Sequence, residues 1–335
     1  MRALLLWLAM GCGPRVGPAP AVSARDLGGD PGLRGEVVSR GDVSDRLAQP
    51  DAAEVVLFYG SEEGGSLEPC GCDAQPRGGL ARAATYMDAV RAADPGRPTV
   101  FVNAGQWLDD SAMLDGRLRP DATERNRWMV AGLQQVGLDA ANASIRDLPA
   151  LSALGAPPDL DIVSAHLQGD GIDAARRIDA GGLTIAITGV SSPGPALHEV
   201  PGFVLGHPVQ DSRATLRSLR ESADLVVLLT YADPKAARTL AREGLVDVVI
   251  DAFEHSAQYA PIRVGDAIWV RSHAGTERLG ELRLWREEGV WQAVDRKVEL
   301  DDGVPARDDE AALAGAARDA IQAVEQAAFG ALPKR

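Results

Sequence analysis

The sequence predicts an α/β domain, in which buried strands alternate with helices along most of the chain. Short apolar runs at residues 55–59 and 99–102 enclose a segment with helical spacing at residues 79–93. Further apolar runs follow at similar intervals, and the pattern becomes strand-like after Pro261. With 335 residues and 45% hydrophobic content, the chain can bury one large core or two modest ones.

Residues 1–12 are typical of an export signal. One positive charge, Arg2, precedes an apolar run that is too short to span a bilayer and that ends at Gly11 and Cys12. This ending resembles a bacterial lipoprotein cleavage site, which predicts an exported, periplasmic or cell-envelope lipoprotein with a membrane anchor on Cys12. A plain secretory peptide that is cut elsewhere, or an apolar start without a role, would fit the same residues.

The next segment, residues 13–53, is rich in Gly, Pro, Asp and Arg and has no sustained apolar period, so we expect a flexible tether. The folded domain is then predicted over residues 54–300. Its strands are expected at residues 55–59, 99–102, 161–164, 183–190, 225–231 and 246–250. Its helices are expected at residues 79–93, 122–136, 213–221 and 235–242.

The C-terminal part of the domain reads as consecutive strands. They are expected at residues 262–264, 267–270, 279–285 and 291–300, as an antiparallel meander that completes a sheet. A Gly/Asp turn at residues 301–303 ends this region. Residues 301–335 are predicted to form a helical tail, because residues 308–330 are rich in alanine and carry acidic residues in their first turn.

The charge of the chain argues against a nucleic-acid partner. The formal net charge is −14, and the only lysines are Lys235, Lys297 and Lys334. Affinity for phosphate backbones comes from clustered cations, which this composition does not favour. An excess of acidic residues more often keeps a protein soluble than marks a binding site.

Four phrases occur in an order that resembles a known family. They are Gly78-Gly79-Leu80-Ala81-Arg82, residues 180–190, residues 246–250 and residues 274–282. In order and spacing, residues 55 to about 285 resemble the catalytic domain of calcineurin-like metallophosphoesterases of the 5′-nucleotidase/UDP-sugar hydrolase type. The resemblance implies an α/β fold, a sandwich of two mixed sheets flanked by helices. It also implies a site where two divalent metals clamp a phosphoryl oxygen and activate water.

Most positions that match the family's metal ligands and catalytic histidine carry other residues. These positions are Glu62, Gly64, Gln106, Ile145, Arg146, Tyr231, Phe253 and His255. Only His255 is unchanged, and Glu62 keeps a carboxylate. One imidazole and one or two carboxylates cannot balance the roughly four positive charges of two metals, so we expect the hydrolytic mechanism to be lost. His255 is then either a leftover histidine or, with Glu62, a weak metal ligand.

A Cys-Gly-Cys motif at residues 70–72 resembles a branch of this family described as phosphoesterase-like (seleno)proteins. A disulfide between Cys70 and Cys72 would close a very small, strained ring, and such disulfides are easily reduced. A redox-active pair with a thiol-disulfide partner is one interpretation. A soft-metal site for Cu(I) or Zn, helped by His255 or Glu62, is a second, and a passive pair is a third.

Three functions therefore stand as hypotheses. The first is a non-hydrolytic envelope protein with thiol redox chemistry at Cys70 and Cys72. The second is a residual metal-dependent phosphoester or nucleotide hydrolase. The third is an anion- or metal-binding module, in which Arg77, Arg82 and Arg146 form a cationic cluster near the old site.

The anchor can be tested directly. We expect the wild-type protein to fractionate with membranes and the Cys12→Ser variant to be released or left unprocessed, because the lipid needs the thiol of Cys12. Mass spectrometry of the mature N-terminus checks this. Any mature terminus other than an acylated Cys12 would contradict the prediction.

Overall fold

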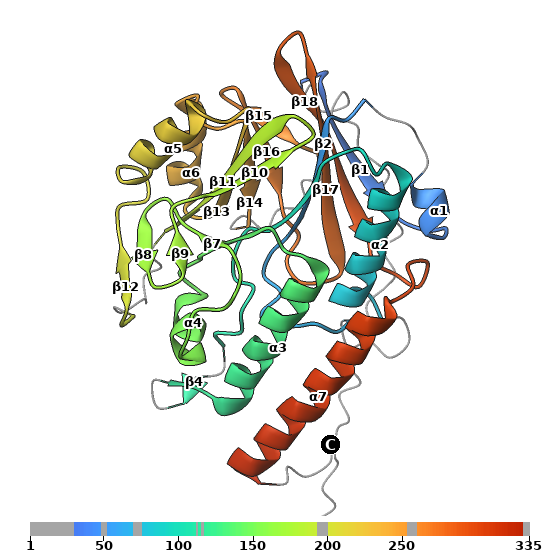
Figure 1. Cartoon of the computed structure of the whole chain (residues 1–335), viewed down its shortest axis with the longest axis vertical. Coiled ribbons are helices and arrows are strands. Elements are labelled where there is room, and N and C mark those ends of the chain that lie inside the picture. The colour runs from blue at the N-terminus through green and yellow to red at the C-terminus, as the bar shows by residue number, and fades with distance from the viewer. Residues whose placement is uncertain are drawn as a thin grey trace, which may run out of the picture.

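Two sheets packed face to face form the centre of the molecule. The computed structural model describes residues 30–47, 52–69, 76–111, 113–114, 117–192, 200–252 and 260–330 (Figure 1). In these residues it has an eight-stranded and a six-stranded sheet, with helices on the outside. The predicted sandwich of two mixed sheets flanked by helices is confirmed.

The first sheet contains, in spatial order, β1 (Leu33–Val38), β18 (Val290–Glu299), β17 (Arg278–Glu287), β2 (Val55–Gly60), β3 (Thr99–Asn103), β6 (Ala140–Asn142), β7 (Ile162–Val163) and β9 (Ile172–Asp173). The strands from β2 to β9 run parallel. The hairpin β17–β18 is antiparallel and joins this group through an antiparallel pairing of β17 with β2.

The second sheet contains, in spatial order, β10 (Arg176–Ala180), β11 (Leu183–Ser191), β13 (Leu225–Tyr231), β14 (Val248–Asp251), β16 (Ala267–Arg271) and β15 (Ile262–Val264). Its four central strands are parallel, and both edge strands are antiparallel to their neighbours. Two short ribbons pair β8 (Leu167–Gly169) with β12 (Phe203–Leu205) and β4 (Met113–Leu114) with β5 (Arg117–Leu118).

Helices cover the outer face of each sheet. The first sheet is covered by α2 (Leu80–Ala93), α3 (Pro120–Val136), α4 (Leu148–Leu154) and α7 (Asp308–Phe329), and the second by α5 (Ser212–Arg220) and α6 (Pro234–Arg242). The short helix α1 (Val43–Arg46) lies beside α2. None of the described helices is long and apolar enough to cross a membrane.

The central parallel strands β2, β11 and β13 are largely apolar because both of their faces are buried. Leu57 and Tyr59 point between the sheets, toward residues such as Val227 of β13. Their neighbours Val56 and Phe58 point to the other face and pack under the helices. Alternation along a strand thus sends successive side chains into two different cores.

The predicted tether over residues 13–53 is wrong for residues 30–47, which form β1 and α1. β1 pairs in parallel with β18 along the edge of the first sheet, and Leu33 is buried. Glu36 also pairs with Arg296 of β18 at 3.0 Å. The strand is short and mixed in polarity, and its partner lies about 260 residues away, so no local period reveals it.

The predicted C-terminal meander is also wrong. The hairpin β15–β16 belongs to the second sheet, through the parallel pairing of β16 with β14. The chain then crosses to the first sheet, where β17 pairs with β2. The strand positions are confirmed, but four strands in sequence do not reveal that they belong to two sheets.

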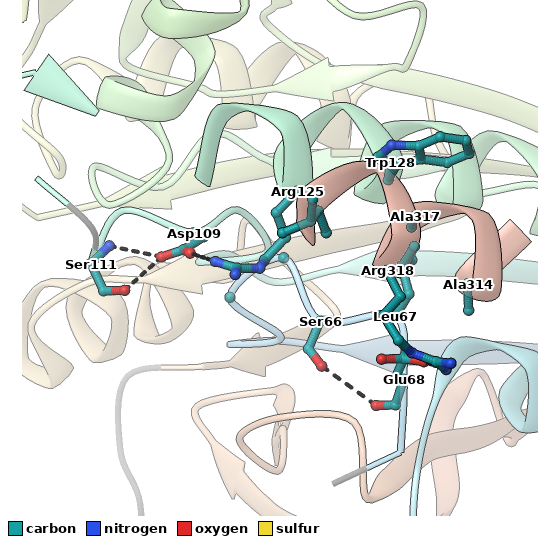
Figure 2. Close-up of a pocket in the computed structure, with 13 residues that line it drawn as sticks. Ser66, Leu67, Glu68, Asp109, Ser111, Arg125, Trp128, Ala314, Ala317 and Arg318 are labelled. Carbon is teal, nitrogen blue, oxygen red and sulfur yellow. Dashed lines mark hydrogen bonds and ion pairs between the residues drawn. The ribbon is translucent and has the colours of Figure 1, made fainter. Parts of the chain in front are cut away.

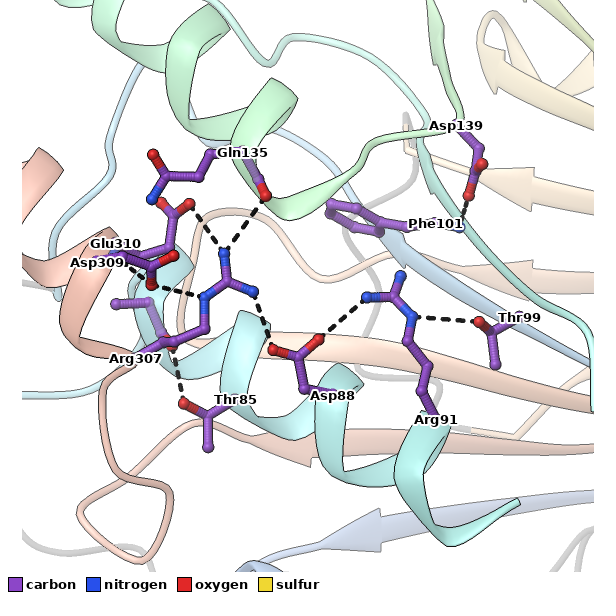
Figure 3. A network of polar contacts seen from close by, with 11 residues as sticks. Thr85, Asp88, Arg91, Thr99, Phe101, Gln135, Asp139, Arg307, Asp309 and Glu310 are labelled. Atoms are coloured by element: carbon purple, nitrogen blue, oxygen red, sulfur yellow. Dashed lines mark hydrogen bonds and ion pairs between the residues drawn. The ribbon is translucent and has the colours of Figure 1, made fainter. Parts of the chain in front are cut away.

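The C-terminal helix α7 is docked by one arginine that contacts three helices (Figure 3). Arg307 donates to Asp88 of α2 at 2.9 Å, to the carbonyl oxygen of Gln135 of α3 at 3.4 Å and to Glu310 of α7 at 3.2 Å. Glu310 is 1% exposed, and burial raises its pKa from 4.5 to about 7. The tail predicted as helical is therefore helical over residues 308–329 and packs on the domain.

The docking of α7 should weaken as the pH rises from about 4.5 to about 7. Folded Glu310 keeps its proton in this range while the unfolded chain releases it, so the free energy of unfolding falls with pH and then stays level. In Glu310→Gln, the fall in the free energy of unfolding between pH 4.5 and 7 should be smaller by about 1–3 kcal/mol. Chemical denaturation at several pH values measures it. Asp319→Asn, exposed on the same helix, should behave as wild type. Parallel curves for wild type and Glu310→Gln would contradict the assignment.

Candidate functional site

The candidate site lies at the carboxyl ends of the parallel strands, where the family's metal-ligand positions were predicted. The backbone N–H of Glu62, after β2, donates to the carbonyl oxygen of Gly105 at 3.0 Å. The N–H of Gly64 donates to the carbonyl oxygen of Gln106 at 3.2 Å. The loops after β2 and β3 are thus bonded to each other, and the structure brings Glu62, Gly64 and Gln106 together.

Gln106 is tied to Tyr231, at the end of β13 in the second sheet. The hydroxyl of Tyr231 donates to Oε1 of Gln106 at 2.7 Å. Burial, and next the charge of Glu62, raise the pKa of Tyr231 to about 12, so the hydroxyl keeps its proton at neutral pH. The two predicted positions are therefore in direct contact, through a side-chain bond between the two sheets.

Both Glu62 and Gln106 have a left-handed backbone, with a φ of 56° in each residue. Residues other than glycine rarely adopt this conformation, and it costs of order 1 kcal/mol or more where it occurs. Gly105, with a φ of 129°, lies against Ser144 and Tyr231, where a Cβ atom would be 2.8 Å and 3.1 Å from the Cβ atoms of these residues. The loops are thus strained and closely packed at the site.

A buried carboxylate, Asp147, holds the backbone of the Gln106 loop. Its oxygens accept from the N–H groups of Gln106 at 3.0 Å and of Leu108 at 2.9 Å, and from the hydroxyl of Ser144. Burial raises the pKa of Asp147 to about 7, although these donors lower it. Sequence patterns assign Asp147 no role, although it directly follows the predicted positions Ile145 and Arg146. The acidic residue directly before α4 was the available signal.

Glu63 is a half-buried carboxyl group that sequence reasoning missed. It accepts from Nδ2 of Asn103 at 2.9 Å, and Oδ1 of Asn103 accepts from the N–H of Gly105 at 3.0 Å. Burial raises the pKa of Glu63 to about 7. Glu63 therefore supports the turn between β3 and Gln106 from the side of the β2 loop.

Ile145 and Arg146 are the residues predicted at the positions where the family has an amide ligand and the catalytic histidine. Ile145 is buried, and its N–H donates to the hydroxyl of Ser191 at 2.9 Å. Arg146 forms a two-fold contact with Asp110, at 2.6 Å from Nε and 3.0 Å from Nη2. Both residues lie at the site, and neither is a usual metal ligand.

The suggested arginine cluster is not supported by the described contacts. Arg82 donates to the carbonyl oxygen of Pro76 at 2.6 Å, whereas Arg146 pairs with Asp110. Arg77 is exposed. No contact within the described part of the chain joins Arg77 or Arg82 to Arg146.

The remaining predicted residues, Cys12, Cys70, Cys72, Phe253 and His255, lie outside the described residues. Across the described ranges, no group of three or more His, Cys, Asp or Glu side chains could hold a metal ion. The predictions for the cysteine pair and for His255 therefore remain predictions.

Solved structures share this fold. No family model matches the sequence, and no curated protein matches it. Sulfate thiohydrolase SoxB of Thermus thermophilus, in complex with glycerol, superimposes with a TM-score of 0.68 and 16% identity, covering 82% of this chain and 62% of that chain. A 5′-nucleotidase precursor, also of Thermus thermophilus, superimposes with a TM-score of 0.63 and 15% identity, covering 81% of this chain and 60% of that chain. A putative 5′-nucleotidase of Staphylococcus aureus superimposes with a TM-score of 0.59 and 11% identity, covering 79% of this chain and 58% of that chain.

These similarities define the fold. The chain has the metallophosphoesterase-like fold of 5′-nucleotidases and SoxB, and it spans less than two thirds of the length of each of those three chains. The predicted fold is therefore confirmed.

The role of Asp147 can be tested by an isosteric change. Asp147→Asn would place an amide N–H against donors that now share one carboxylate, so we expect the free energy of unfolding to fall by about 2–4 kcal/mol. Ser144→Ala, which removes one donor, should cost about 1 kcal/mol. Denaturation of both variants measures this. Equal losses would contradict the central role of Asp147.

Proposed function

We propose that this chain is an exported, lipid-anchored protein of 5′-nucleotidase-like fold, with a degenerate two-metal site that does not hydrolyse phosphoesters and with thiol redox chemistry at Cys70 and Cys72. The observation that carries the loss of hydrolysis is the 2.7 Å bond from the Tyr231 hydroxyl to Oε1 of Gln106. An amide oxygen that accepts from a tyrosine replaces a carboxylate that would bridge two metals in the family.

The residues around the Tyr231–Gln106 hydrogen bond also favour the loss of phosphoester hydrolysis. Two divalent ions need several anionic or imidazole ligands around them. Ile145 offers a buried aliphatic side chain, and Arg146 adds a cation at the same edge. Asp147, a buried carboxylate at this edge, is already bonded to the backbone of the Gln106 loop. Gln106, Tyr231 and Asp147 are thus bonded to the protein's own groups, which favours a protein that holds no metal pair.

The redox part of the proposal rests on the motif and on where its flanks are held. The carbonyl oxygen of Leu67 accepts from the N–H of Leu80 at 3.0 Å, and that of Glu68 accepts from the hydroxyl of Thr276 at 3.4 Å. After the motif, Arg82 donates to Pro76 at 2.6 Å. Both flanks are thus attached near the start of α2, and a guanidinium group contacts one of them. A nearby cation stabilises a thiolate, which suits redox chemistry.

A residual metal-dependent hydrolase is the second candidate, because the structures with the same fold include 5′-nucleotidases. An anion- or metal-binding module, with Cys70, Cys72, His255 and Glu62 as soft-metal ligands, is the third. The two experiments below separate all three.

The purified full chain should hydrolyse neither AMP nor bis(p-nitrophenyl) phosphate with Mn, Zn, Co or Mg added. The reason is that the residues at positions 106, 145 and 231 cannot ligate two ions. Release of phosphate and of p-nitrophenol measures this. Metal-dependent turnover that disappears in His255→Ala would overturn the non-hydrolytic proposal and favour the hydrolase.

Cys70 and Cys72 should form a disulfide that millimolar glutathione reduces, with a reduction potential well above the roughly −300 mV typical of structural disulfides. Titration in glutathione and dithiothreitol buffers, with alkylation and mass spectrometry, measures it. Cys12→Ser should leave the potential unchanged, whereas Cys70→Ser and Cys72→Ser should each abolish the bond. A pair that stays reduced and binds one Cu(I) or Zn with high affinity would favour the metal module instead.

A further inference from the structure

A pocket beside the candidate site lies between α3, α7 and the loop that follows β2 (Figure 2). Its volume is about 230 Å³, and Gly64 borders both this pocket and the candidate site. The volume is below the roughly 300–1,000 Å³ of sites for drug-sized ligands, so an occupant would be small.

Two ion pairs form opposite walls of the pocket. Arg125 of α3 pairs with Asp109, and Arg318 of α7 pairs with Glu68. In Figure 2 the two pairs lie on either side of Ser66. The pocket thus presents two positive and two negative groups and has no net charge from these four side chains.

The Asp109 wall is rigidly built. Its carboxylate, 7% exposed, accepts from the N–H of Ser111 at 2.9 Å and from the hydroxyl of Ser111 at 2.6 Å. The stem of Arg125 packs on Gly65, where a Cβ atom would lie 3.1 Å from its Cγ and Cδ atoms. Gly65 has a φ of 76°, so the close approach and the backbone both require glycine. Arg125 and Asp109 are therefore held in place before any ligand arrives.

Each pair uses only part of its hydrogen-bonding capacity. Among the described residues, Arg125 contacts an acceptor only through Nη1, and Arg318 only through Nη2. The other guanidinium N–H groups remain available for a carboxylate, and Oε2 of Glu68 remains available for an ammonium group. A third wall is apolar and comes from Leu67, Trp128, Ala314, Ala317 and Ile321.

We propose that this pocket binds a small zwitterion with an apolar side chain, of the class of the apolar α-amino acids. The carboxylate would bind Arg125 or Arg318, the ammonium group would bind Glu68, and the side chain would lie in the hollow above Ala314 and Ala317. A ligand with only one kind of charge meets a repelling group in both pairs, whereas a dipolar ligand finds a partner for each of its charges. The proposal goes beyond redox or hydrolytic chemistry at the candidate site and needs neither.

Isothermal titration calorimetry of the full chain with L-leucine tests the proposal. We expect leucine to bind, and 4-methylpentanoate and 3-methylbutylamine, which each lack one charge, to bind at least about tenfold more weakly. Arg318→Ala should weaken leucine about tenfold; this side chain is 64% exposed, so the change should not affect folding. Ala317→Leu should abolish binding by filling the hollow.

A matched control is Arg127→Ala, an exposed residue of α3 that pairs with Glu124 outside the pocket, and it should bind leucine as wild type does. Three results would overturn the proposal. They are no heat with leucine at millimolar concentration, equal affinity for leucine and the singly charged analogues, and sulfate binding as tight as leucine. If both Arg318→Ala and Ala317→Leu bound leucine as wild type does, leucine would bind outside this pocket. That result would also overturn the proposal.

Discussion

The packing of one sheet against the other is the constraint on which the candidate site depends. Leu57 and Tyr59 of β2 meet Val227 and Leu229 of β13 in the space between the sheets. Because interiors are close-packed, neither sheet can slide without opening a cavity. The carboxyl ends of β2, β3 and β13 are therefore held at one edge. The hydrogen bond between Tyr231 and Gln106 joins the two sheets at this edge. If the ends of the two sheets moved independently, this bond could not persist.

Internal hydrogen bonds hold the loops of the candidate site together. Glu62 and Gln106 adopt the left-handed conformation, although a relaxed loop would avoid its cost. The bonds of Asp147 to Gln106 and Leu108 supply the stabilisation that makes this conformation tenable. The two loops are thus fixed by contacts with each other and with the start of α4.

The sequence predicts the long, uniform elements well and the short ones poorly. The strand predicted at residues 225–231 has those bounds because it is apolar throughout and ends at polar residues. β6 was missed because its three residues, two of them alanine, carry no strand preference. At the site, the order of the motifs brought Glu62, Gln106 and Tyr231 together correctly. The roles of Glu63 and Asp147 depend on how distant loops fold over each other, which no local pattern contains.

The pairing of β1 determines where the chain enters the domain. Through β18 and β17, Leu33 is level with Val55, at the amino end of β2 and therefore at the edge of the sheet opposite Gln106. Asp30 is fastened there by Arg263. Between the lipid proposed on Cys12 and this point, residues 13–29 could reach no farther than about 60 Å when fully extended. In an anchored molecule, the chain would therefore join the domain on the side away from Gln106 and Tyr231.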